Sequence, residues 1–315
     1  MDRKLDILAI GEAMVEFNQV QSGDGRNYLQ GFGGDTSNAV IAAARQGARC
    51  AYFTRLGGDE FGRLLLDLWR GEGVDCSAVV TDALAPTGIY FVHHDQRGHC
   101  FSYRRAGSAA SRMAPADLPA ALIASARFLH VSGISQAISD SAMQTVVQAI
   151  AVARSVGTAV SFDPNLRLAL WPLDKARAAL LATLPLCDEF LPSIDDIRPL
   201  SGLGDSAEPE QLIAWCHAHG ARRVVLKLGE RGALLSEGQG CTPIAPYAVN
   251  AVDASGAGDC FDGSYLARRA AGDDPLSAAR WASAAAALAT TGYGAVAPLP
   301  SVVATSALVH MHAME

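Results

Sequence analysis

The stretch Asp253-Ala-Ser-Gly-Ala-Gly-Asp-Cys-Phe-Asp-Gly263 joins a glycine-rich turn to a carboxylate and the start of an apolar helix. Gly256 and Gly258 lack a β-carbon, so the backbone here can bring its N–H groups close to a bound anion. Asp259 falls in the first helical turn, where unpaired amides point outward. The combination suits phosphoryl transfer to an alcohol, because Asp259 can take the hydroxyl proton while the amides hold the developing charge. The same pattern also fits a simple helix cap after a glycine-rich turn.

Along most of the chain, short apolar runs alternate with helical segments. We expect strands at 5–10, 50–54, 127–131, 158–162, 190–191 and 223–227, and helices at 38–46, 61–70, 142–155, 209–219 and the alanine-dense 282–289. This alternation predicts an α/β fold with a doubly wound, mostly parallel sheet flanked by helices. No Pro/Gly/Ser-rich linker divides the chain, so we expect a single domain over 1–315.

Two segments, about 14–32 and 87–105, break this rhythm by alternating apolar and polar residues without a helix between them. Residues 87–92 and 98–103 predict a β-hairpin that turns at 95–98. A small sheet projecting from an α/β body would form a lid, although an ordinary edge hairpin is the alternative. Its unpaired edges would also allow a homodimer through the lid.

The composition excludes several other classes of protein. Half of the 315 residues are hydrophobic and only 7% are aromatic, which indicates a sizeable aliphatic core. A formal net charge of −7 argues against a nucleic-acid binder. The seven cysteines are scattered without a CxxC pair, as expected for reduced thiols of a cytoplasmic protein. No apolar run approaches the roughly 18 residues of a membrane span.

The opening stretch resembles the C-terminal signature of the ribokinase/PfkB family of sugar kinases. The resemblance implies a ribokinase-like fold, ATP as the phosphoryl donor, and Asp259 as the catalytic base beside an anion hole made by the amides of Gly256, Ala257, Gly258 and Asp259. Mg²⁺ is expected as well, because the charge of ATP must be neutralised for transfer. The chain has Ala254-Ser255 where the family often has Thr-Thr, which leaves the base and the glycines intact.

A second glycine pair, in Gly33-Gly-Asp-Thr-Ser-Asn38, precedes the helix expected at 38–46 and lets the backbone approach a polyol. The segment resembles the family's N-terminal signature, which implies that Gly33, Gly34 and Asn38 contact sugar hydroxyls. A capped helix, with Asp35 or Thr36 as the cap, is compatible with that role.

Three later segments predict the residues that contact the nucleotide. Lys227-Leu-Gly-Glu-Arg-Gly232 lacks the P-loop spacing but resembles the family's nucleotide-lining motif, which implies contacts from Lys227, Gly229 and Gly232, together with Gly256 and Gly258. A lysine at a strand end is more often simply solvated. Asn165 follows the strand at 158–162, where crevice ligands are expected. Ser193 stands where many family members have the first residue of Asn-x-x-Glu.

The segment Tyr103-Arg-Arg-Ala-Gly-Ser-Ala-Ala-Ser111 distinguishes between substrates. In a strand, Tyr103 and Arg105 share one face while Arg104 points away. Arg105 and Arg167 together would clamp a carboxylate, because a guanidinium pairs with it bidentately. This segment and Tyr90 resemble the 2-keto-3-deoxygluconate kinases of the family, although surface arginines are common.

The sequence therefore predicts an ATP-dependent sugar-acid kinase that phosphorylates O6 of 2-dehydro-3-deoxy-D-gluconate. A fructokinase or another sugar kinase of the same family is the first alternative, because residues 163–171 also resemble fructokinases. A non-catalytic sugar-acid sensor on a kinase fold is the second.

Overall fold

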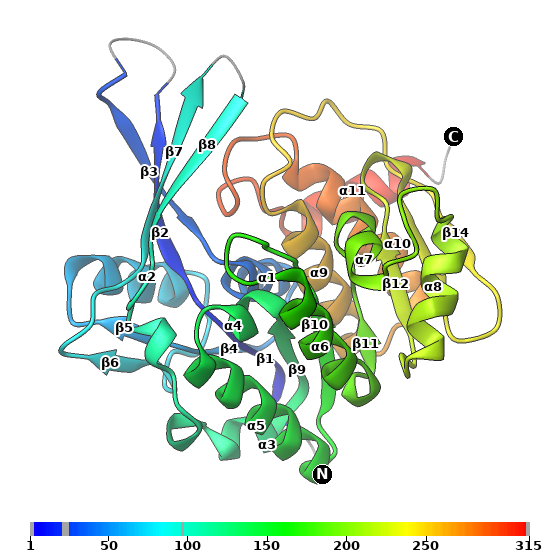
Figure 1. Ribbon diagram of the computed structural model, residues 1–315. Helices are drawn as coiled ribbons and strands as arrows, with labels where there is room; N and C mark the ends of the chain where they lie inside the picture. The colour runs from blue at the N-terminus through cyan, green and yellow to red at the C-terminus, as the bar shows by residue number, and fades with distance from the viewer. Residues whose placement is uncertain (1–2, 21–24, 96–97, 313–315) are drawn as a thin grey trace.

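Buried apolar strands assemble into one eight-stranded sheet in the order β14-β13-β12-β11-β10-β9-β1-β4 (Figure 1). The computed structural model describes residues 3–20, 25–95 and 98–312. The parallel part consists of β1 (Leu5–Ile10), β4 (Cys50–Phe53), β9 (Ala126–Ser132), β10 (Ala159–Asp163), β11 (Glu189–Phe190) and β12 (Val224–Lys227). Two antiparallel strands, β13 (Ala233–Ser236) and β14 (Thr242–Ile244), extend one edge.

Helices cover both faces of this sheet and enclose two apolar cores. The first core includes residues of α3 (Ala120–Ser125), α5 (Asp140–Val156), α6 (Leu173–Thr183), α7 (Ile194–Ser201) and α8 (Pro209–Ala218). The second includes residues of α1 (Asp35–Arg45), α2 (Glu60–Gly71), α9 (Ala257–Ala271) and α10 (Pro275–Ala289), and α11 (Val302–His312) packs beside α10. Along β1, Leu8 and Ile10 enter the first core while Ile7 and Ala9 enter the second. The sheet is therefore buried on both faces, which confirms the doubly wound α/β prediction.

The predicted strands and helices are all present; their ends shift by at most three residues, except that the helix predicted at 282–289 is the longer α10, which begins at Pro275. Helix α1 begins at Asp35, three residues earlier than predicted, directly after Gly34 in a positive-φ conformation. The sequence analysis had not identified α3, α4 (Gly133–Ala137), α6, α7, α11 or the β13–β14 extension. Helix α4 is short and starts at a glycine, and α7 contains Pro199, so neither shows a clear helical pattern.

A separate four-stranded sheet has the order β3-β2-β7-β8 and projects from the main body (Figure 1). It contains β2 (Met14–Gln19), β3 (Tyr28–Gly33), β7 (Ile89–Asp95) and β8 (Gly98–Arg104). Strands β7 and β8 pair antiparallel with Asp95 opposite Gly98, so the predicted hairpin is confirmed. A short ribbon of β5 (Arg55–Gly57) and β6 (Val80–Asp82) lies near its base. That the small sheet acts as a lid, and that the whole chain is one domain, remain predictions.

Helices α1 and α9 approach each other closely at Gly263. A β-carbon at this position would overlap the carbonyl oxygen of Ala39 and lie 3.0 Å from the Ala42 β-carbon. Only glycine therefore permits this spacing, which brings the two helix N-termini together.

We expect Gly263→Ala to lower the free energy of unfolding by about 1–3 kcal/mol, because the helices must move apart. Urea unfolding followed by circular dichroism measures the change. Gly71→Ala is the matched control: its β-carbon meets nothing within 4 Å at the end of α2, so stability should stay constant or rise. A Gly263→Ala protein as stable as the wild type would show that the close approach is not required.

Candidate active site

The first turn of α9 presents both a carboxylate and backbone N–H groups. Gly256 is the N-cap with φ 73°, and no side chain caps this end of α9 among the described residues. A β-carbon on Gly256 would press on Ala295 at 2.9 Å, so glycine is needed for both conformation and space. The uncapped amides make this helix end suited to an anion.

Asp259 lies at this helix end and accepts a hydrogen bond of 2.8 Å from Asn38 Nδ2 on α1. Although the residue is only half-buried, its carboxyl is surrounded by protein, and this desolvation with the nearby charges of Asp35 and Asp163 raises the Asp259 pKa to about 7. The Asn38 hydrogen bond and the Lys227 charge oppose that rise. A carboxyl that titrates near neutral pH is suited to accept a proton from an alcohol.

Asp35, at the start of α1, is a site residue that the sequence analysis considered only as a helix cap. It is 8% exposed, and neither of its side-chain oxygens has a hydrogen-bond partner among the described residues. Burial and the charge of Asp163 raise its pKa, while the Ser132 hydroxyl and the Thr36 N–H, which lie near the carboxyl without meeting hydrogen-bond geometry, oppose that rise. Buried acceptors without partners are costly unless a ligand supplies donors. Its position one helical turn before Asn38 was the signal that could have identified it.

Lys227, at the end of β12, lies beside the N-terminus of α9. Its Nζ donates to Asp163 Oδ2 at 3.1 Å and to both oxygens of Asp262 at 2.9 and 3.0 Å. The ammonium is buried and paired, in contrast to the solvated lysine that strand ends usually carry. Its contact with a triphosphate remains a prediction.

The predicted sugar-binding residues lie where the small sheet meets α1. A β-carbon on Gly33 would overlap the Tyr90 hydroxyl, and one on Gly34, at φ 123°, would overlap the Glu12 carbonyl oxygen. Tyr90 is buried and donates to Glu16, and its ring stacks on Tyr103 with centroids 5.6 Å apart. The structure therefore brings Gly33, Gly34 and Tyr90 together, with Tyr103 beside them.

The two arginines of the predicted clamp have different surroundings. Arg105 Nε donates to Glu12 Oε2 at 2.8 Å, and Glu12, only 1% exposed, also accepts from Ser108. The Arg105 guanidinium lies over the Tyr103 ring, but Arg105 follows the last residue of β8, so the two side chains do not share a strand face as predicted. Arg167 is exposed and donates to the Leu166 carbonyl. The clamp remains a prediction, and the sequence did not reveal the Glu12 partner.

The predicted nucleotide residues lie on loops at the carboxyl edge of the sheet. Asn165 is buried with φ 36°, and the adjacent Leu166 N–H donates to Asp196. Ser193 caps α7 and donates to Asp196 Oδ2 at 2.6 Å. Asp196 thus links the two loops, a role that the sequence analysis did not assign.

The turn after β12 contains the two remaining predicted nucleotide contacts. Gly229 has φ 62° and Gly232 has φ 84°. A β-carbon on Gly232 would overlap the Ile244 carbonyl oxygen. Both positions favour glycine for backbone reasons, so their proximity to a nucleotide stays a prediction.

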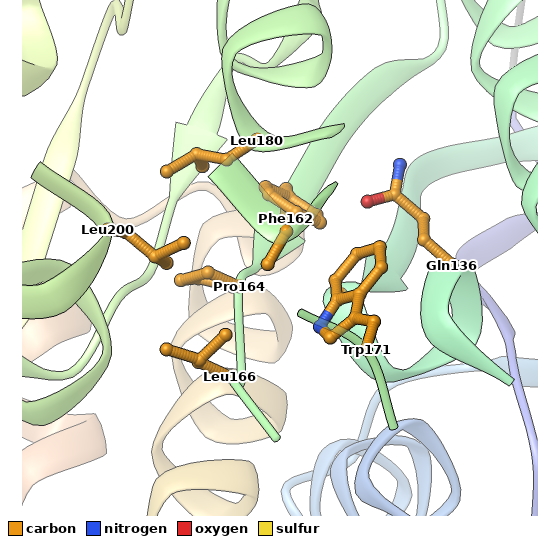
Figure 2. Close-up of a pocket in the computed structure, with 9 residues that line it drawn as sticks. Gln136, Phe162, Pro164, Leu166, Trp171, Leu180 and Leu200 are labelled. Carbon is orange, nitrogen blue, oxygen red and sulfur yellow. The ribbon is translucent and has the colours of Figure 1, made fainter. Parts of the chain in front are cut away.

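A small cavity lies behind the loop that follows β10. Figure 2 shows Trp171 and Gln136 beside an apolar group that includes Phe162, Pro164 and Leu180. Its volume of about 10 Å³ is that of a single water molecule. It is therefore too small to hold a sugar or a nucleotide.

The described part of the chain has neither a metal-ligand cluster nor a membrane-spanning helix. No group of three or more His, Cys, Asp or Glu side chains there is arranged to hold a metal ion. Within the same ranges, no helix has the length and apolar character needed to cross a membrane.

Comparisons with known proteins identify the family to which the chain belongs. Residues 4–302 match the model of the pfkB family carbohydrate kinases. The chain is 39% identical to the 2-dehydro-3-deoxygluconokinase of Thermoproteus tenax, over 94% of this chain and 92% of that protein. It is 30% identical to probable fructokinase-4 of Arabidopsis thaliana, over 94% of each.

A solved structure shows the same fold with nucleotide bound. The putative ribokinase II of E. coli, in complex with ATP and Mg²⁺, superposes with a TM-score of 0.88 at 26% identity, over 98% of this chain and 100% of that one. Together with the family match, this shows a ribokinase-like fold. The chain belongs to the pfkB family of carbohydrate kinases.

Proposed function

We propose that this carbohydrate kinase transfers the γ-phosphoryl group of ATP to O6 of 2-dehydro-3-deoxy-D-gluconate, giving the 6-phosphate. The observation that carries the proposal is the Asp259 carboxyl, which is surrounded by protein, accepts from Asn38 and has its pKa raised to about 7 at the uncapped N-terminus of α9. The 39% identical relative and the position of Arg105 beside Tyr103 support a sugar acid as the acceptor.

In this proposal Asp259 accepts the O6 proton as the hydroxyl attacks, and Asn38 holds the carboxylate in place. The N–H groups at the start of α9 stabilise charge on the transferred group. Asp35 and the Gly33–Gly34 backbone orient the sugar hydroxyls, and Arg105 and Arg167 hold the carboxylate end. Closure of the small sheet excludes water, so that ATP is not hydrolysed.

Residues present in the chain fit ATP. The uncapped N-terminus of α9 and the positive-φ glycines Gly229 and Gly232 allow the close backbone approach that phosphates need. We propose that Asn165 and Ser193 also contact the nucleotide. Mg²⁺ supplies neutralisation of the phosphate charge. Because no metal-ligand cluster occurs in the described ranges, we propose that the ion is held chiefly by phosphate oxygens and water.

We further propose a homodimer formed through the small sheet. Strands β3 and β8 are its two edges, and Leu29 and Phe101 on them are 68% and 48% exposed. Unpaired edges with exposed apolar side chains are stabilised when a second subunit covers them. A cytoplasmic location is part of the same proposal.

A fructokinase is the second candidate. The Arg105 charge is already paired with the buried Glu12, which weakens its attraction for a substrate carboxylate. Fructokinase relatives also match over the same span. A non-catalytic sensor is less consistent with the intact base and anion site.

A coupled ADP-release assay tests the substrate directly, with 2-dehydro-3-deoxygluconate, its galactonate analogue, fructose and glucose compared under the same conditions. We expect kcat/KM for the keto-deoxy acids to exceed that for fructose by about 10²-fold or more, because only the acids satisfy the arginines. Faster turnover of fructose would make the protein a fructokinase. Ligand-induced thermal stabilisation without any ADP release would favour a sensor.

A further inference from the structure

The pairing of Lys227 is unusual for a residue expected to meet a nucleotide. Its side chain is 11% exposed, and its two partners, Asp163 and Asp262, are 6% and 1% exposed. Three hydrogen-bond contacts at 2.9–3.1 Å occupy the ammonium, which has three donors. The amine therefore points into the protein, toward carboxylates rather than toward solvent.

The ammonium also lies against the turn that starts α9. A β-carbon built on Gly258 would lie 3.7 Å from Lys227 Nζ, an ordinary van der Waals distance. Asp262 is on α9 itself, three residues after Asp259 and therefore one turn along the same face. The buried cation is thus placed beside the turn that carries both the proposed base and the proposed anion-binding amides.

This region is rich in carboxylates, and the charge of Lys227 opposes the rise in the Asp259 pKa that burial and those carboxylates cause. The charged, titratable or hydrogen-bonding groups that face Asp259 come from every element packed around it: Asp35 and Asn38 of α1, Tyr90 of β7, Asp163 of β10, Lys227 of β12, and Cys260 and Asp262 of α9. Lys227 is the cation of this set, and burial weakens solvent screening of its field. Asp262 and Asp163 each cancel part of that field.

We propose that Lys227 and Asp262 are positioning residues that set the charge state of the catalytic base: Lys227 keeps Asp259 ionised from behind the α9 turn, and Asp262 holds the ammonium there and moderates its effect. This inference rests on the proposed role of Asp259. It assigns Lys227 an indirect role, whereas direct binding of the triphosphate is the competing interpretation.

The two interpretations differ in the pH dependence of kcat. The wild type loses activity as the pH falls below about 7, because protonated Asp259 cannot accept a proton. Lys227→Met removes the favourable charge, so this acidic limb should move up by about 1 pH unit. Burial and the charge of Asp163 raise the pKa of Asp262, and the Lys227 charge opposes that rise. Over the pH range in which Asp262 is ionised, Asp262→Asn leaves the ammonium less neutralised, so the limb should move down, by roughly half a unit. A merely structural pair would not shift the limb in opposite directions.

Both variants are measured in steady-state assays from pH 5 to 9 with saturating sugar and ATP, alongside the double variant Lys227→Met/Asp262→Asn. Asp262→Asn retains the Lys227–Asp163 pair, so it provides a readout if the lysine variant does not fold. Opposite shifts, with a double variant between them, support the inference. Unchanged limbs, or a KM for ATP raised more than about tenfold in Lys227→Met with its limb at the wild-type pH, would overturn it in favour of direct phosphate binding.

Asp259→Asn separates this inference from the proposed function. If that variant is inactive while Lys227→Met and Asp262→Asn keep the wild-type limb, the base assignment stands and the charge-setting pair is wrong. If Asp259→Asn keeps normal turnover, the proposed role of Asp259 itself fails.

Discussion

Asp259→Asn should reduce kcat by about 10²–10⁴-fold while the sugar still binds. The amide occupies the same space and can meet Asn38 through its carbonyl oxygen, but it cannot take up the hydroxyl proton. A continuous ADP-release assay gives kcat, and isothermal titration with the sugar gives its affinity. An affinity within about threefold of the wild type would place the loss in the chemical step.

Asp67→Asn is a suitable control for this experiment. Asp67 is an exposed residue of α2 whose side chain pairs with Arg63 at 2.7 Å. Exposed pairs of this kind contribute at most about 1 kcal/mol to stability, so turnover should be unaffected. An Asp259→Asn enzyme as active as Asp67→Asn would require a different base.

Much of the fold was predictable because local patterns determine it. Apart from Asp6, β1 is an apolar run because both of its faces are buried. Helix α5 is followed by Gly157 in a left-handed conformation, and this glycine marks the end of the helix in the sequence. The β7–β8 hairpin was also predictable from a local pattern, because its two strands are adjacent in sequence. Short elements such as α4 gave no signal, because a five-residue helix contains barely more than one period.

The sequence predicted many of the residues that belong to the candidate site, but not which of them form hydrogen bonds or ion pairs with one another. Asp259 and Asn38 were both identified, yet their hydrogen bond joins residues 221 positions apart, which no local pattern encodes. The pairing of Lys227 with Asp163 and Asp262 depends in the same way on strands and a helix that meet only in the folded chain. Residue type and spacing therefore indicated the chemistry, while tertiary structure determined which charges neutralise one another.

Arg105→Ala should raise KM for the keto-deoxy acid by about 10²-fold, with little effect on KM for fructose, if Arg105 binds the substrate carboxylate. Loss of one charge-assisted hydrogen bond costs roughly 1.5–3 kcal/mol of binding free energy. Fructose has no carboxylate, so its binding should not depend on this hydrogen bond. Arg104→Ala is the matched control: this neighbouring arginine is exposed and donates only to the Tyr103 carbonyl among the described residues.

Glu12→Gln distinguishes substrate binding from a purely structural role of the same arginine. Glu12 neutralises Arg105 and is almost fully buried, so the neutral amide should free the guanidinium for a substrate carboxylate and lower KM for the keto-deoxy acid by a few-fold. If Arg105 instead serves only to anchor the end of β8, Glu12→Gln and Arg105→Ala should both reduce thermal stability and raise KM for every sugar alike. Opposite effects of the two variants on the acid, with fructose unaffected, are expected only when the guanidinium meets the carboxylate of the substrate.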